Sequence, residues 1–129
     1  MTKFTVILVV LIITCSPIKS QTHTEKLRNN NVKRELLKDY FLCVCLSESF
    51  EDVKENDISE SVYFDIIRYS PKVFEKINVY AKKFIATIES TQIDDLGNKK
   101  AITLEILEKY KSKELDKFIK SLDKYILDE

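Results

Sequence analysis

Few residues in this chain are able to carry out covalent or metal chemistry. His23 is the only histidine, so a Cys–His or Ser–His pair would have to recruit it as the base, and it lies in a polar segment near the N-terminus. Cys43 and Cys45 are separated by one residue rather than the two typical of zinc sites, and further ligands are missing. Because Gly97 is the only glycine, no phosphate-binding loop can be written. The sequence therefore predicts no catalytic residue, no metal ligand and no cofactor.

Clustered carboxylates are the remaining candidates for acid–base catalysis. They are Asp94-Asp95, the group of Glu48, Glu51 and Asp52, and the terminal pair Asp128-Glu129. None of them has an obvious acid–base partner in the sequence, and surface carboxylates are ordinarily solvated. We expect acidic surface at these positions. An enzyme would instead need two of these acids to face each other in a deep pocket.

The two neighbouring cysteines are not expected to form a disulfide with each other. On a helix, residues two positions apart point about 200° away from each other around the axis. The Cβ atoms of Cys43 and Cys45 would therefore diverge, which a disulfide does not tolerate. We expect one or both thiols to be buried as small apolar groups. An intermolecular disulfide is the alternative.

The N-terminus has the pattern of a secretory signal peptide. Lys3 precedes an apolar run from Phe4 to Ile13 that no charge interrupts. A bilayer span needs about 20 apolar residues, so this run is too short for stable insertion, although a retained membrane anchor is one alternative. We expect residues 1–20 to be removed and residues 21–129 to form one exported domain. Lipidation at Cys15 is a second alternative, but the usual Gly or Ala does not precede that cysteine.

Composition narrows the class of the remaining domain. Removal of 20 of the 129 residues leaves 109, the size of one compact domain. Two of the 21 basic residues leave with the signal, so the mature chain has 19 basic and 21 acidic residues and a net charge of −2. Nucleic-acid binding has no electrostatic support. One glycine, two prolines and 33% charged residues favour an all-α fold, a compact bundle of about five helices.

Apolar residues that recur every three or four positions predict these helices. The first, near residues 30–48, is apolar around much of its circumference and should be central in the bundle. The second begins at Asp57, which would form a capping box with Glu60. The expected inner stripe of the second helix is Ile58, Val62, Ile66 and Tyr69.

Three further helices are expected in the second half of the chain. Ser70 would cap the third at its N-terminus, with Pro71 in the first turn, and this helix would continue to about Glu89. A break rich in Asp, Gly and Asn separates it from the fourth helix, whose apolar residues begin at Ala101. Ser112 would cap the fifth. The expected apolar face of the fifth helix is Leu115, Phe118, Ile119, Leu122, Tyr125 and Ile126.

Several blocks of residues, in order between positions 36 and 122, resemble the immunity proteins that neutralise type VI secretion amidase effectors. The segment Tyr40–Leu46 is similar to the N-terminal helix of that family. The segments Ser61–Phe64 and Tyr69–Ile77 are similar to its middle part. The segment Tyr110–Asp116 resembles its C-terminal signature and is the most distinctive of the blocks.

The resemblance implies a function outside the cytoplasm. Such a protein waits in the periplasm and occludes the active site of a cysteine–histidine amidase that cuts peptidoglycan crosslinks. Family members are described as dimers that insert a protruding loop into the cleft of the enzyme. By position, the corresponding loop is Ser90–Lys100. The residues expected to bind the partner are Gln92, Ile93, Asp94, Asp95, Leu96, Gly97 and Asn98.

The chain departs from the family pattern at one position. A cysteine often stands near the position of Ile106 and could pair with the one that matches Cys45, so this bridge is not expected here. Apolar contact would then have to hold the first and fourth helices together.

Alternatives exist for both the site and the function. Within the loop, Ile93 and Leu96 would be apolar anchors, and Asp94 and Asp95 would meet a basic rim or the catalytic histidine of the amidase. The loop could instead be a simple helix connector, and the acidic segment Ser47–Asn56 is the competing contact surface. The alternative function is an exported helical adaptor or chaperone, which would need a large open apolar groove for client peptides.

Overall fold

The computed structural model describes residues 30–90, 95 and 97–127. The expected signal peptide, Cys15 and His23 lie outside these residues. The described residues form six α-helices and one 3₁₀ helix and contain no strand, which confirms the all-α prediction. One isolated antiparallel bridge joins Tyr69 to Ile126. The elements are α2 (Asn30–Ser49), α3 (Glu51–Asn56), α4 (Ser59–Ile66), α5 (Lys72–Ala86), α6 (Ile102–Tyr110), α7 (Lys113–Ser121) and η2 (Asp123–Tyr125).

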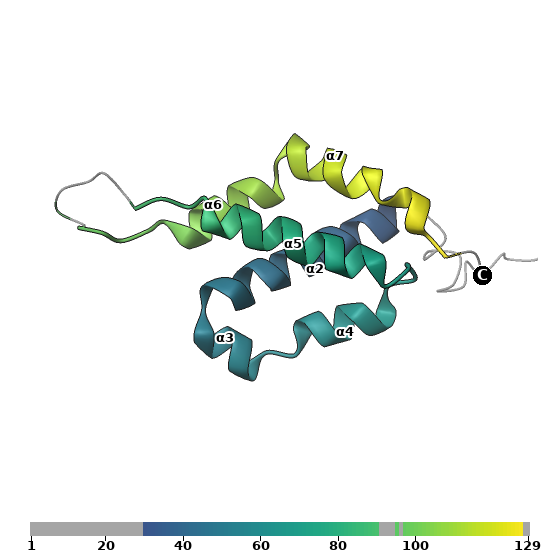
Figure 1. Cartoon of the computed structure of the whole chain (residues 1–129), viewed down its shortest axis with the longest axis horizontal. Coiled ribbons are helices and arrows are strands. Elements are labelled where there is room, and N and C mark those ends of the chain that lie inside the picture. The colour runs from purple at the N-terminus through teal and green to yellow at the C-terminus, as the bar shows by residue number, and fades with distance from the viewer. Residues whose placement is uncertain (1–29, 91–94, 96, 128–129) are drawn as a thin grey trace, which may run out of the picture.

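Helix α2 is the centre of the bundle, as its broad apolar surface predicts. It contacts each of the five helices α3 to α7. In Figure 1, α5 crosses in front of α2, while α3 and α4 lie to one side and α7 to the other. Leu37, Phe41 and Cys45 on α2 are fully buried. A helix that has neighbours on several sides needs apolar residues on several faces, and this is why its sequence pattern is wide.

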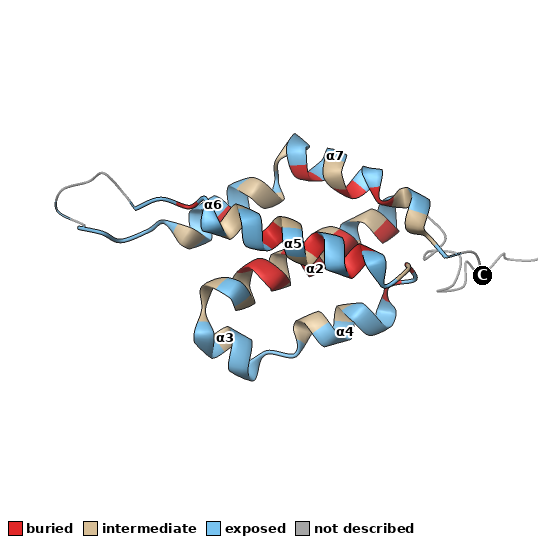
Figure 2. Ribbon diagram, in the orientation of Figure 1, coloured by how far each residue is buried: buried red, intermediate tan, exposed pale blue. Residues whose placement is uncertain are grey.

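The hydrophobic core runs along α2 between α5 and the pair α6–α7. Figure 2 shows the buried residues gathered on the facing sides of these helices. Aromatic rings extend the packing: Tyr40 meets Phe74 edge-on with 5.0 Å between ring centroids, and Phe41 lies 5.9 Å from Tyr80. The other fully buried side chains of the core include Val73, Ile77, Ala81, Ile106, Leu115 and Ile119.

The segment after α2 folds differently from the expectation. No helix was expected in the acidic segment Ser47–Asn56, but it contains the short helix α3. Asn56 at its last position donates a 3.1 Å hydrogen bond from its side chain to the Asp52 carbonyl. Acidic residues Glu51 and Asp52 occupy the first turn, where the helix dipole favours negative charge. This helix accounts for six helices where about five were expected.

The predicted inner stripe of the second helix is wrong. Ile58 is 73% exposed, and Val62 and Ile66 are also exposed, so the apolar stripe of α4 faces solvent. The helix ends at Ile66, and Tyr69, which was expected on the same stripe, is buried in the segment that follows. Tyr63 packs against the core instead. The four-residue spacing was read correctly as helical, but it could not show which side of so short a helix meets α2.

The predicted capping box of α4 does not form, because the N-cap residue is Ile58, whose side chain makes no capping hydrogen bond. The Asp57 carboxylate accepts a 2.6 Å hydrogen bond from the Ser59 backbone N–H, and the Ser59 side chain together with this N–H holds the pKa of Asp57 below its usual range. Glu60 does not complete the box, because its carboxylate accepts a hydrogen bond from the Ser47 hydroxyl on α2. The glutamate therefore ties α4 to the central helix.

The two serine caps that the sequence predicted have different outcomes. The Ser112 hydroxyl accepts a 3.1 Å hydrogen bond from the Leu115 N–H, which confirms the cap of α7. Ser70 makes no such bond: α5 begins one residue later than expected, with Pro71 at its N-cap, and the Ser70 carbonyl accepts from the Val73 N–H. Helix α5 also ends at Ala86, three residues before the expected end at Glu89.

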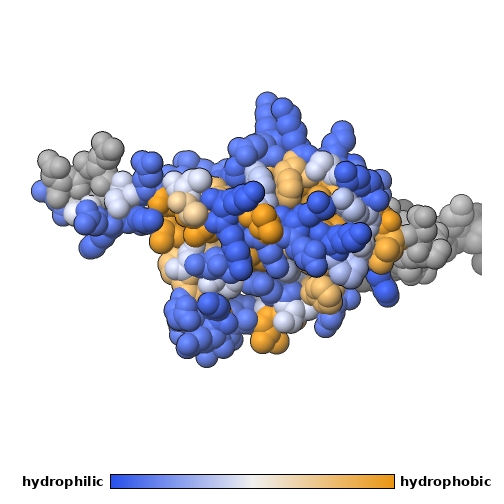
Figure 3. Space-filling model, in the orientation of Figure 1, coloured by the Kyte–Doolittle hydropathy of each residue, from blue (hydrophilic) through white to orange (hydrophobic). Residues whose placement is uncertain are grey.

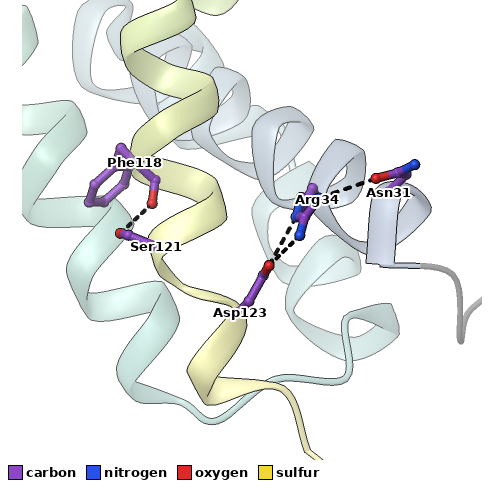
Figure 4. A network of polar contacts seen from close by, with 5 residues as sticks. All are labelled: Asn31, Arg34, Phe118, Ser121 and Asp123. Atoms are coloured by element: carbon purple, nitrogen blue, oxygen red, sulfur yellow. Dashed lines mark hydrogen bonds and ion pairs between the residues drawn. The ribbon is translucent and has the colours of Figure 1, made fainter.

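The end of the fold is fastened to its beginning by one ion pair. Arg34 near the start of α2 donates from Nε to Asp123 Oδ1 at 3.0 Å, and its Nη2 atom contacts the other carboxylate oxygen (Figure 4). Arg34 also donates to the Asn31 side chain at 3.2 Å. This two-pronged contact fixes the position of η2, which follows α7. None of the helices in the described residues is long and apolar enough to cross a bilayer.

Candidate functional site

The connection between α5 and α6 projects from the helical body. In Figure 1 its two described arms run outward together, away from the ends of both helices. Asp95, Gly97 and Asn98, three of the residues expected to bind a partner, are exposed. The other four, Gln92, Ile93, Asp94 and Leu96, lie outside the described residues. The exposed arms make this connection available to a second molecule.

Gly97 has a backbone requirement in this connection. Its φ is +59°, in the left-handed region that residues with a side chain rarely adopt. A Cβ atom built at this position would meet no atom within 4 Å, so space does not select the glycine. The Asp-Gly-Asn pattern was interpreted as a turn, and the turn at Gly97 and Asn98 agrees with that interpretation.

The first arm of the connection is anchored at its root. Ile88 is 6% exposed and holds the first arm against the body. The Thr87 hydroxyl donates a 2.6 Å hydrogen bond to the Phe84 carbonyl at the end of α5. A hollow of about 380 Å³ lies between the arms, and Ser90 and Ala101 both line it. The arms are therefore close at their roots.

Polar contacts hold α5, α6 and α7 together next to this connection. The sequence analysis did not find these contacts. Lys109 Nζ lies 2.8 Å from the Glu114 carboxylate, which also accepts a 2.9 Å hydrogen bond from the Tyr80 hydroxyl. The bond from Lys109 lowers the pKa of Glu114. This cluster joins α5, α6 and α7. The Tyr110–Asp116 block contains Glu114, but no sequence pattern indicated that Tyr80 would meet it.

The acidic segment Ser47–Asn56, the competing contact surface, carries ordinary surface partners. Glu48 lies 3.2 Å from Lys82 Nζ, and Glu51 lies 3.9 Å from Lys54 Nζ. The Asp52 carboxylate accepts a 3.1 Å hydrogen bond from Asn56. The three carboxylates therefore face cations or amides on the surface and do not face one another in a pocket.

The cysteines do not have the environment of catalytic nucleophiles. Both are free thiols, Cys45 buried and Cys43 half-buried. Burial raises the pKa of Cys43 to about 11 and that of Cys45 to about 12, whereas a reactive cysteine needs a lowered pKa. The described residues contain no group of three or more His, Cys, Asp or Glu side chains that could hold a metal ion.

No disulfide bridge was expected between the positions of Ile106 and Cys45, and the structure shows apolar packing there. Ile106 is 1% exposed and belongs to the same core cluster as Cys45. Apolar packing therefore connects α6 to α2, as expected.

Comparison with known proteins agrees with the resemblance that the sequence carries. The family model Tai4, described as a type VI secretion system (T6SS) amidase immunity protein, matches residues 35–119. This match runs from the second turn of α2 to Ile119 in α7 and includes the projecting connection. No curated protein and no solved structure is similar enough to the chain to match it. The chain belongs to the Tai4 family of type VI secretion amidase immunity proteins.

Proposed function

We propose that this chain is a periplasmic immunity protein that binds a type VI secretion peptidoglycan amidase and occludes its active site. The family match carries this proposal. The N-terminal signal pattern supports export, since the amidase acts on the cell wall. The protein would work by binding alone, without catalysis or a cofactor, on an effector of the cysteine–histidine type.

The connection between α5 and α6 is the proposed contact with the amidase. It projects from the helical body, and the root of its first arm is held by Ile88 and by the Thr87 hydroxyl. Anchoring of this root lowers the entropy lost on binding, because this part of the arm does not have to be ordered at that moment. In this proposal residues 92–98 enter the active-site cleft, Ile93 and Leu96 are the apolar anchors, and Asp94 and Asp95 meet basic groups.

The test measures cleavage of crosslinked muropeptides by the cognate amidase. The wild-type chain should abolish cleavage once it exceeds the enzyme. Asp95→Lys should weaken inhibition, since it reverses a charge at the proposed contact. The matched control is Asp52→Lys, which reverses an exposed aspartate on α3 and should leave inhibition intact. Undiminished cleavage in an excess of wild-type chain would refute the proposed function. If Asp52→Lys weakens inhibition and Asp95→Lys does not, the amidase contacts the acidic segment Ser47–Asn56 instead.

The proposed assembly also includes a homodimer. The exposed stripe of α4, formed by Ile58, Val62 and Ile66, is an apolar surface that a second copy could cover by twofold symmetry. Val62→Glu should then convert the dimer to a monomer in light scattering after gel filtration. A wild-type chain that is monomeric at high concentration would contradict this part of the proposal.

The groove between α5 and α7 is not the large open apolar groove that the adaptor alternative requires. Lysines as well as apolar side chains line this groove. On the face drawn in Figure 3, apolar surface occurs in separate patches among polar side chains.

A further inference from the structure

A groove between α5 and α7 lies apart from the connection that the proposed function uses. Its volume is about 490 Å³, within the range of sites that bind small ligands or short peptide segments. Val79 and Tyr80 of α5 line one side, and Phe118 of α7 lines the other. The groove is open to solvent along its length.

The floor of the groove is formed by apolar side chains that remain accessible to solvent. The Tyr80 and Phe118 rings stack with 4.1 Å between centroids and 10° between their planes. Figure 4 shows the Phe118 ring on the side of α7 that faces away from Arg34. Val79 is 54% exposed beside this stack. An apolar side chain laid over Val79 and the stacked rings would remove this surface from water.

Three lysines surround that floor. Lys76, Lys83 and Lys124 line the groove together with one carboxylate, Glu75. Lys76 and Lys124 stand 5.6 and 5.3 Å from the centroid of the Tyr125 ring, which directs both ammonium groups to the same end. The groove is therefore positively charged.

None of these three lysines has a carboxylate partner in the described part of the chain, so their charges are not neutralised by an ion pair. Elsewhere Lys38 lies 2.9 Å from Asp116, Lys82 lies 3.2 Å from Glu48, and Lys109 lies 2.8 Å from Glu114. Unpaired cations at the rim of an apolar floor are complementary to a ligand that has both carboxylates and an apolar side chain.

The distance between the lysines determines how far apart the two carboxylates of a ligand must be. Lys76 and Lys83 are seven residues apart on α5, which corresponds to about 10 Å along the helix. An extended peptide covers that distance in about three residues. We propose that this groove binds an acidic peptide segment of a partner protein, with two carboxylates three residues apart and an apolar side chain between them.

The proposal is tested by nuclear magnetic resonance titration of the full chain, without any amidase. The probe is the capped peptide Gly-Glu-Leu-Phe-Glu-Gly, at low salt and at physiological salt. The backbone signals of Val79, Tyr80 and Phe118 should shift and saturate, with weaker binding at the higher salt concentration. A control peptide with Gln in place of both Glu residues should bind about 2- to 30-fold more weakly, since it lacks the two charges.

A pair of variants separates specific binding from general attraction to a basic surface. Lys76→Glu combined with Lys83→Glu should abolish saturable binding. Lys117→Glu is the matched control, because Lys117 is an exposed lysine of α7 outside the groove, and it should leave binding nearly unchanged. Equal binding of both peptides, shifts confined to other helices, or equal losses in both variants would each overturn the proposal. The amidase assay is unaffected by any of these results, so the two proposals fail separately.

Discussion

The Tyr110 hydroxyl donates a 2.7 Å hydrogen bond to the Asp39 carboxylate and so joins the last residue of α6 to the middle of α2. Tyr63 on α4 donates to the other oxygen of the same carboxylate at 3.4 Å. One aspartate on the central helix therefore positions two flanking helices. Hydrogen bonds to a charged acceptor are stronger than neutral ones, and this one holds the helix that follows the projecting connection.

Removal of the Tyr110 hydroxyl should destabilise the protein. We expect Tyr110→Phe to lower the free energy of unfolding by about 1.5–3 kcal/mol, the range for hydrogen bonds to charged groups. Urea unfolding followed by circular dichroism measures this change.

The matched control is a second tyrosine, Tyr69, whose hydroxyl makes no hydrogen bond in the described residues. Tyr69 Oη is buried and has no hydrogen-bond partner in the part of the chain that the structure describes. Tyr69→Phe should therefore be neutral or stabilising, because it removes a desolvated and unpaired group. Equal losses in the two variants would contradict the assignment of the Tyr110 bond.

Stability should fall at alkaline pH for a related reason. The hydrogen bond to Asp39, followed by burial, raises the pKa of Tyr110 to about 12, and burial raises the pKa of Cys45 to about 12 from its usual 9.0. In the unfolded chain these groups lose their protons at lower pH than in the folded chain. Their contribution is therefore complete below pH about 9 and is lost as the pH rises toward 12.

Urea midpoints between pH 8 and 11 test this dependence. The midpoint should fall steadily above pH about 9. Tyr110→Phe should show a shallower fall, since it lacks one of the titrating groups. A midpoint that is constant up to pH 11 would show that these groups titrate alike in the folded and unfolded chains.

The sequence predicted the helices better than it predicted how they pack. The wide apolar pattern of α2 and the Ser112 cap were predicted correctly, because each depends on residues close together in the chain. The apolar face expected for the fifth helix is correct only as far as Ile119, because α7 ends at Ser121 and the remaining residues, Leu122, Tyr125 and Ile126, lie in and around η2. The side of α4 that faces inward was predicted wrongly, because Glu60 bonds to Ser47 on another helix. The same limit applies to the Tyr80–Glu114 and Tyr110–Asp39 bonds, which join residues 34 and 71 positions apart.

The candidate site was predictable only by position. Turn residues marked the break between α5 and α6, but the outward course of its arms depends on how α5 and α6 pack. The lysine-lined groove was not found at all, because Lys76 and Lys124 meet only when α7 and η2 fold back beside α5.

The buried thiol should resist chemical modification. In a chain with Cys15→Ser and Cys43→Ser, Cys45 is the only thiol, and it is fully buried. We expect no reaction with Ellman's reagent in the native state and complete reaction in urea, since a buried thiol with a raised pKa is neither accessible nor ionised. The matching chain that retains Cys43 should react measurably faster, because that residue is half-buried. Rapid native labelling of Cys45 would contradict the packing of α2.

Apolar packing between α6 and α2 should contribute several kcal/mol to the free energy of unfolding. Ile106→Ala should lower the free energy of unfolding by about 2–5 kcal/mol, because it leaves a cavity in the core. The control is Leu104→Ala on the same helix, which is 56% exposed and should cost less than about 0.5 kcal/mol. Similar values for the two variants would mean that α6 does not pack as described.

The most direct test of the account replaces residues 91–98 with a short Gly-Ser linker and measures inhibition of the cognate amidase. The roots of the connection line one hollow, so a short linker can join them and leave the helices in place. The account predicts a variant with unchanged helical content and unfolding midpoint that no longer inhibits crosslink cleavage. Full inhibition by this variant would contradict occlusion by the projecting connection.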